Sequence, residues 1–184
     1  SEARLGELAT GALRGLGLRQ QDAADASRIL VMADLLGLAT HGVSRIESYG
    51  ERLDMGGIKA RPDIRSDRVA PTLVKIDGDN GVGPLVGVRA LEAAMEIARE
   101  SGMAMAFARG SNHFGPVAPY CLIAAEAGFA SIIGSNATTT IAPWGGREER
   151  LGNNPLGLCV PNPQGDPIVL DMAMSVVARA KIRQ

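Results

Sequence analysis

Apolar residues recur at helical spacing through the first third of the chain and then gather into short runs. Three amphipathic helices are predicted early, because the apolar positions of each fall on one stripe. They span residues 2–16, about 22–36 and about 43–55. Gly17 and Gly37 follow the first two, as glycine commonly does at a helix end. The pattern predicts a small helical domain over residues 1–57.

Residues 58–71 are polar and contain Pro62 and Pro71, which predicts a linker. Beyond the linker, strands are expected at 72–76, 103–108, 129–134, 156–160 and 168–170, and helices at 85–100, at 117–127 and from Val176. The hairpin connection between the last two strands requires antiparallel pairing. We therefore expect an α+β chain whose second domain, residues 72–184, has a mixed sheet.

Three glycines imitate a dinucleotide-binding loop. Gly81, Gly83 and Gly87 follow a predicted strand and precede a predicted helix, as Rossmann glycines do. A Rossmann site also needs an acidic residue at the end of a second strand about 20 positions later. Glu96 and Glu100 instead fall within the predicted helix. We interpret these glycines as a tight helix-entry loop.

Composition narrows the classes of function. The 184 residues are 46% hydrophobic and 21% charged, which is typical of a globular chain. A net charge of −1 gives no reason to expect nucleic acid or a membrane surface as a partner. No apolar run approaches the roughly 20 residues needed to cross a bilayer. Cys121 and Cys159 lack metal-ligand spacing, so we expect free thiols in a reducing cytoplasm and no metal site.

The two histidines are the candidates for acid–base chemistry. His113 lies in the glycine-bounded loop 110–115 between a predicted strand and a predicted helix, and His41 lies between Gly37 and Gly42. Histidine is the side chain whose unperturbed pKa suits proton transfer near neutrality. A hydrogen-bonded structural role for each histidine is an equally good interpretation of the residues alone.

His41, Arg45 and Tyr49 recur every four residues. If the third helix includes His41, the three side chains share one face, where the guanidinium could bind a carboxylate through two charge-assisted hydrogen bonds. An ordinary solvated face with a half-buried tyrosine is the alternative, and on these residues alone it is the stronger one.

Five motifs occur in order along the chain. They are Thr40-His41-Gly42 with Arg45 and Tyr49, then Ser111-Asn112-His113-Phe114-Gly115, Pro143-Trp144-Gly145-Gly146, Gly152-Asn153-Asn154-Pro155 and Leu170-Asp171-Met172-Ala173. In this order they resemble the malate/L-lactate dehydrogenase-like family of NAD(P)-dependent oxidoreductases. That family includes ureidoglycolate, sulfolactate and malate dehydrogenases, diketogulonate reductase and a piperideine-carboxylate reductase. The resemblance covers nearly the whole chain.

The resemblance implies a small helical domain packed on a cofactor domain that is not a Rossmann fold and whose sheet is largely antiparallel. It implies a cytoplasmic homodimer that transfers hydride between NAD or NADP and a small 2-hydroxy or 2-keto acid. Reduction of a cyclic imino acid of the piperideine-2-carboxylate type is the alternative reaction. A ligand-binding or structural protein that has lost catalysis is the alternative class.

The resemblance also implies roles for residues of this chain. The catalytic acid/base candidates are His113 and His41. The implied substrate-binding residues are Thr40, Arg45, Tyr49 and Asn154. The implied cofactor-binding residues are Asn136, Ala137, Asp171, Met172 and Ala173. We prefer His113 as the acid/base because its loop lies between two core elements, which leaves His41 to orient the substrate.

The chain departs from the family pattern at several positions. Thr40 stands where the family usually has serine, which keeps the hydroxyl. Asn153 and Met174 replace usual threonines, which weakens the match there. Family members continue well beyond Gln184 and carry further cofactor contacts, including a basic position near the phosphates. We therefore expect that the 184 residues are an incomplete piece of the subunit, or that the remainder is a separate segment.

Overall fold

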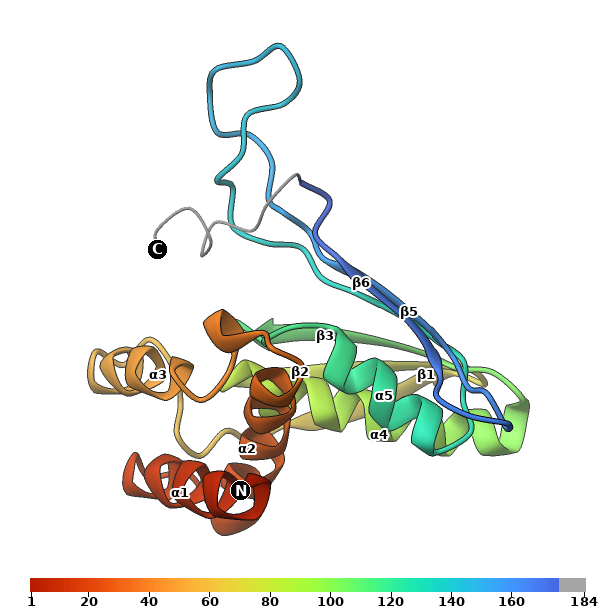
Figure 1. The fold of residues 1–184 in the computed structure, drawn as a ribbon, viewed down its shortest axis with the longest axis horizontal. Coiled ribbons are helices and arrows are strands. Elements are labelled where there is room, and N and C mark those ends of the chain that lie inside the picture. The colour runs from red at the N-terminus through yellow and green to blue at the C-terminus, as the bar shows by residue number, and fades with distance from the viewer. Residues whose placement is uncertain (176–184) are drawn as a thin grey trace. The chain divides into compact units, whose positions relative to one another are not determined.

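The computed structural model describes residues 1–175 (Figure 1). The chain forms two compact units, Ser1–Gly115 and Pro116–Gln184. The helix predicted from Val176 lies outside the described residues. The division predicted from sequence, a helical domain over residues 1–57 followed by a linker, stays a prediction.

The first unit begins with the three predicted helices. They are α1 (Glu2–Gly15), α2 (Gln20–Leu35) and α3 (Arg45–Asp54), and a short 3₁₀ turn, η1 (Ala39–His41), lies between the last two. Leu13, Leu30 and Tyr49, one from each helix, are buried in a single hydrophobic cluster with Ile58 and Val82. This cluster explains the apolar stripes in the sequence, because each helix turns its stripe toward the other two.

A three-stranded sheet completes the first unit. Its strands are β1 (Arg65–Ala70), β2 (Leu73–Gly81) and β3 (Met105–Ser111), in the order β1-β2-β3, and α4 (Gly83–Ser101) connects β2 to β3. The β1–β2 pair is antiparallel and the β2–β3 pair is parallel. Helix α4 packs on the sheet through a cluster that contains Val74, Ile76, Val86 and Ile97.

Two parts of this sheet differ from the prediction. Strand β1 occupies the second half of the segment predicted as a linker, and all six of its residues are exposed, so no alternating apolar pattern marked it. Strand β2 runs on to Gly81 instead of ending near Ile76, because the polar stretch that follows Ile76 still pairs with neighbouring strands. Gly83 then begins α4, as the interpretation of a helix-entry loop requires.

The second unit pairs one helix with an antiparallel sheet. Its elements are α5 (Ala118–Glu126), β4 (Ser131–Gly134), β5 (Leu156–Val160) and β6 (Ile168–Met172), and the strand order is β4-β5-β6. Both strand pairs are antiparallel, which confirms the predicted hairpin. Cys121 and Cys159 are buried free thiols, as predicted. Gly157 has no room for a side chain, since an added Cβ would lie 2.4 Å from a methyl group of Val117.

The α+β class and the largely antiparallel pairing are therefore confirmed, although the strands form two small sheets within the described residues and not one. The parallel β2–α4–β3 connection borders the antiparallel strand β1, unlike the parallel sheet of a Rossmann fold. Within residues 1–175, no helix combines the length and the apolar character that a membrane span requires.

Candidate active site

The two histidines lie side by side in the first unit, although they are far apart in the sequence. His41 belongs to η1, and His113 follows the end of β3. The two imidazole rings stack with their centroids 5.5 Å apart and an interplanar angle of 28°. Two groups that can each carry a proton therefore share one small region, as acid–base chemistry on a bound substrate would require.

Tyr49 approaches the His113 side of this pair from α3. Its hydroxyl oxygen lies 3.1 Å from Nδ1 of His113 and 3.3 Å from the His113 carbonyl oxygen. The tyrosine is 2% exposed, and this burial raises the pKa of its hydroxyl above the ordinary value of 10, against the opposing charges of Arg45 and Arg52. Tyr49 is therefore an uncharged phenol that can both donate and accept a hydrogen bond.

Thr40 contacts the imidazole of His41, and Arg45 is bonded to Thr40. The Thr40 hydroxyl lies 2.8 Å from Nδ1 of His41, and the Arg45 Nε donates to the Thr40 carbonyl oxygen at 2.6 Å. Within residues 1–175 this is the one hydrogen bond of the Arg45 side chain, so its terminal nitrogens are available to a ligand. His41 does not lie in α3, because Gly42 is extended and separates η1 from the helix. The shared helical face considered from sequence is thus replaced by a turn packed against the helix.

The turn that carries His41 depends on Asp34, a residue that sequence reasoning missed. The Asp34 carboxylate accepts a hydrogen bond from the backbone N–H of Val43 at 2.9 Å. An added Cβ on Gly42 would lie 1.9 Å from an oxygen of that carboxylate. Glycine is therefore required in the His41 turn for the Asp34 carboxylate to fit. No pattern marked this contact, since Asp34 lies nine positions before Val43, in a different element.

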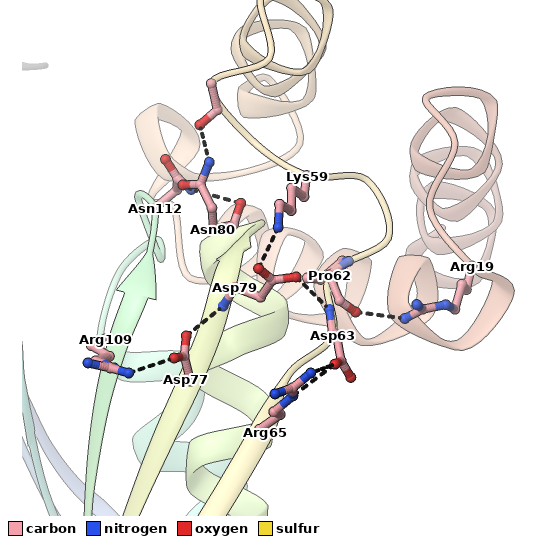
Figure 2. Close-up of polar contacts among 11 residues, drawn as sticks. Arg19, Lys59, Pro62, Asp63, Arg65, Asp77, Asp79, Asn80, Arg109 and Asn112 are labelled. Atoms are coloured by element: carbon pink, nitrogen blue, oxygen red, sulfur yellow. Dashed lines mark hydrogen bonds and ion pairs between the residues drawn. The ribbon is translucent and has the colours of Figure 1, made fainter.

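The loop that carries His113 is held by the far end of β2 (Figure 2). The Asn112 side chain donates to the carbonyl oxygens of Asn80 and Gly81 and to the side-chain oxygen of Asn80, at 3.0 to 3.3 Å. Gly83 lies so close that an added Cβ would be 2.2 Å from the His113 carbonyl oxygen. Gly83 thus admits the backbone of the His113 loop, whereas Gly81 lies against Pro62.

Two aspartates next to Asn80, Asp77 and Asp79, stabilise this end of β2 through hydrogen bonds and ion pairs (Figure 2). The Asp79 carboxylate accepts from the backbone N–H of Asp63 and pairs with Lys59, and the Asp77 carboxylate accepts from the backbone N–H of Asp79 and pairs with Arg109. These backbone donors are the largest cause that lowers the pKa of each carboxyl group, followed by the pairing with the basic side chain. The contacts of Asp79 join segment 57–65 to β2, the strand whose end accepts the hydrogen bonds of Asn112.

The environment of His113 lowers its pKa from 6.5 to about 4. Desolvation is the largest cause, and the positive charges of Arg45, His41 and Arg52 add to it. His113 also keeps an exposed surface, and solvent there weakens the desolvation without reversing the downward direction of the shift. A pKa below 6.5 leaves the imidazole neutral at pH 7, when it can accept a proton.

The residues predicted to contact a cofactor gather at one end of the sheet in the second unit. The Asn154 side chain accepts from the backbone N–H of Ala137 at 2.9 Å, which ties the start of β5 to the end of β4. The N–H of Met174 donates to the Asn153 carbonyl oxygen at 2.7 Å, which brings the end of β6 to the same place. Asn136, Asp171, Met172 and Ala173 belong to these segments.

Asp171 has a structural contact of its own. Its carboxylate accepts from the N–H groups of Val117 and Ala118 at 3.1 and 2.8 Å, at the start of α5. Asparagine amides and an exposed methionine, Met172, provide polar and apolar groups at this end of the sheet. They fit the carboxamide and the ring of a nicotinamide, which need that combination. Among the described residues, no group of three histidine, cysteine or acidic side chains could hold a metal ion.

Known proteins resemble the chain over its full length. The family model described as malate/L-lactate dehydrogenase matches residues 1–184. Malate dehydrogenase from Pyrococcus horikoshii is 41% identical over 170 residues, which are 92% of this chain and 47% of that protein. The NADP(+)-dependent (2R)-3-sulfolactate dehydrogenase of Chromohalobacter salexigens is 35% identical over 95% of this chain and 52% of its own length. The NAD(+)-dependent ureidoglycolate dehydrogenase of Escherichia coli is 31% identical over 99% and 52%.

Solved structures also match nearly the whole of this chain. The malate dehydrogenase structure from Pyrococcus horikoshii OT3 superposes with a TM-score of 0.94 at 40% identity, and the match covers 99% of this chain and 52% of that one. The delta1-piperideine-2-carboxylate reductase from Pseudomonas syringae pvar. tomato gives a TM-score of 0.92 at 27% identity over 100% and 55%. The chain therefore spans about half the length of the curated relatives that it matches.

Proposed function

The chain belongs to the malate/L-lactate dehydrogenase family, and from that premise we propose that the protein is an NAD(P)-dependent dehydrogenase acting on a small 2-hydroxy acid. The observation that carries the proposal is the stacked pair of His41 and His113, with Arg45 bonded to the turn beside it. Similar proteins are named for NAD(+) in one case and NADP(+) in another, so either cofactor is compatible with the family.

In the proposed mechanism, Arg45 binds the substrate carboxylate through its terminal nitrogens, and Thr40 is a further substrate contact. The carboxylate contact fixes the hydroxyl-bearing carbon, and such orientation is a large part of catalysis. His113 then accepts the hydroxyl proton at Nε2 while the C–H bond breaks. Asn136, Ala137, Asp171, Met172 and Ala173 would hold a nicotinamide, which would supply the acceptor for the hydride of that C–H bond.

The lowered pKa of His113 favours oxidation of the hydroxy acid, because the base must be neutral before it accepts a proton. Reduction of the keto acid needs the imidazolium form instead. A carboxylate bound at Arg45 offsets one of the positive charges that lower this pKa. Binding of the substrate therefore raises the pKa of His113 toward the value that reduction requires.

This electrostatic arrangement predicts the pH dependence of oxidation. Because the pKa of His113 lies below 6.5, we expect kcat/KM to stay level as the pH falls through 6.5 and to decline only in more acidic buffer. Arg52→Met removes one of the charges that lower this pKa, so the decline should begin at a higher pH. Kinetics across pH, together with an NMR titration of the His113 ring, measures both effects.

A matched control is Arg14→Met, which removes the same charge from the exposed side of α1 and should leave the profile in place. A wild-type decline centred at or above pH 6.5 would contradict the prediction.

The proposed function is tested by assaying the complete subunit with malate, lactate, 3-sulfolactate and ureidoglycolate, each with NAD(+) and NADP(+). We expect turnover of at least one 2-hydroxy acid. Reduction of piperideine-2-carboxylate by NADPH or NADH is the matched assay for the second candidate, which the similarity to a reductase of that substrate favours. Turnover of the imine alone would replace the first function by the second, and no nicotinamide-dependent turnover at all would remove both.

Two further parts belong to the proposal. The family resemblance implies that the protein forms a homodimer, and the free thiols of Cys121 and Cys159 support a reducing cytoplasm as its location.

A further inference from the structure

The Tyr49 hydroxyl has one hydrogen and faces two polar groups of His113. The Tyr49 oxygen lies 3.1 Å from Nδ1 of His113 and 3.3 Å from the carbonyl oxygen of the same residue. The carbonyl oxygen can only accept a hydrogen bond. Nδ1 of a neutral imidazole donates in one tautomer and accepts in the other.

Only one tautomer satisfies all three groups. When Nδ1 carries the hydrogen, it donates to the Tyr49 oxygen, and the Tyr49 hydroxyl donates to the carbonyl oxygen. When Nδ1 is bare, the single hydroxyl hydrogen must serve two acceptors, and one of them loses its partner. The two His113 groups face the hydroxyl of a tyrosine that is 2% exposed, at 3.1 and 3.3 Å, so water would have to enter between these protein groups to replace the lost bond. Unpaired polar groups in buried positions are costly, which favours the Nδ1–H form.

We propose that Tyr49 is a positioning residue that keeps neutral His113 in the Nδ1–H tautomer, so that the lone pair on Nε2 faces the substrate hydroxyl. Within residues 1–175, Nε2 of His113 has no hydrogen-bond partner. The catalytic meaning of this arrangement rests on the proposed function, whereas the tautomer itself does not. Tyr49, implied as a substrate contact by the family resemblance, acts here through the histidine.

The contact between Thr40 and His41 differs from the contact between Tyr49 and His113. Nδ1 of His41 lies 2.8 Å from the Thr40 hydroxyl, and no second partner of that hydroxyl is found among the described residues. A hydroxyl with a single neighbour can donate or accept, so this contact fixes neither tautomer of His41. The contacts of Tyr49 with His113 therefore agree with the preference for His113 as the base.

The tautomer can be read directly from ¹⁵N chemical shifts, which separate protonated from bare imidazole nitrogens. The experiment uses the complete subunit labelled with ¹⁵N-histidine at pH 8, and the His113 signals are assigned by their loss in His113→Gln. We expect a protonated Nδ1 and a bare Nε2 for His113. In Tyr49→Phe the pattern should shift toward Nε2–H, the form that unconstrained histidine favours. Thr40→Val, the matched loss of a hydroxyl, should leave the His113 pattern in place.

Kinetics then separates a positioning role from a substrate contact. If Tyr49 acts through His113, Tyr49→Phe lowers kcat for hydroxy-acid oxidation about tenfold, the size of one hydrogen bond, and leaves KM close to wild type. An increase in KM with unchanged kcat overturns the proposal in favour of a substrate contact. A wild-type His113 with Nε2–H, or an unchanged pattern in Tyr49→Phe, overturns it as well. If the tautomer behaves as expected and no substrate turns over, the inference stands and the proposed function fails.

Discussion

His113→Ala is expected to lower the single-turnover rate of hydride transfer by roughly 10²–10⁴-fold, the range for loss of a positioned acid/base. His113 has the lowered pKa and the defined contact to Tyr49 that a base in hydroxy-acid oxidation needs. His41 stacks on its ring and contacts Thr40, and we expect it to orient the substrate. His41→Ala should therefore reduce the rate less and raise KM more.

Single-turnover measurement separates the two variants because it excludes product release from the observed rate. Thermal unfolding of both proteins provides the control for a general loss of structure. His113→Ala that keeps its rate while His41→Ala loses it would reverse the assignment and give His41 the role of base.

The sequence predicted those elements whose apolar pattern is set by the core. Helices α1 to α4 were expected because each buries one stripe, as Leu13 and Leu30 do in the helical cluster. The antiparallel β5–β6 pair was expected from the turn residues between the two strands. Strand β1 was not, because an exposed strand whose hydrogen bonds are made to β2 leaves no mark on side-chain chemistry.

The sequence could likewise predict some residues of the candidate site and not others. His41, Arg45 and His113 could be named from residue type and spacing, because acid–base and carboxylate chemistry uses few side chains. Asp34 and Asn80 could not, since they act by holding backbone of another segment, and such contacts depend on the fold. Gly83 was interpreted as part of a helix-entry loop, and it does begin α4, but its second role, making room for the His113 carbonyl group, depends on the fold.

Arg45→Met is expected to raise KM for the hydroxy acid strongly and to lower kcat/KM by roughly 10²–10⁴-fold, since two charge-assisted hydrogen bonds of about 1.5–3 kcal/mol each are lost. Arg45→Lys should recover only part of this loss, because an ammonium group cannot reproduce the planar two-point contact of a guanidinium. A substrate analogue tests whether Arg45 binds the carboxylate. An analogue with a carboxamide in place of that carboxylate should bind wild type and Arg45→Met about equally.

Arg45 also lowers the pKa of His113, so its removal has a second, electrostatic effect that must be separated from lost binding. Arg52→Met provides that separation, because Arg52 lowers the same pKa from the same helix and has no proposed contact with the substrate. The two variants should both move the acidic decline of kcat/KM toward higher pH, and only Arg45→Met should raise KM. Equal KM values in the two variants would remove Arg45 from the substrate site and leave it an electrostatic role alone.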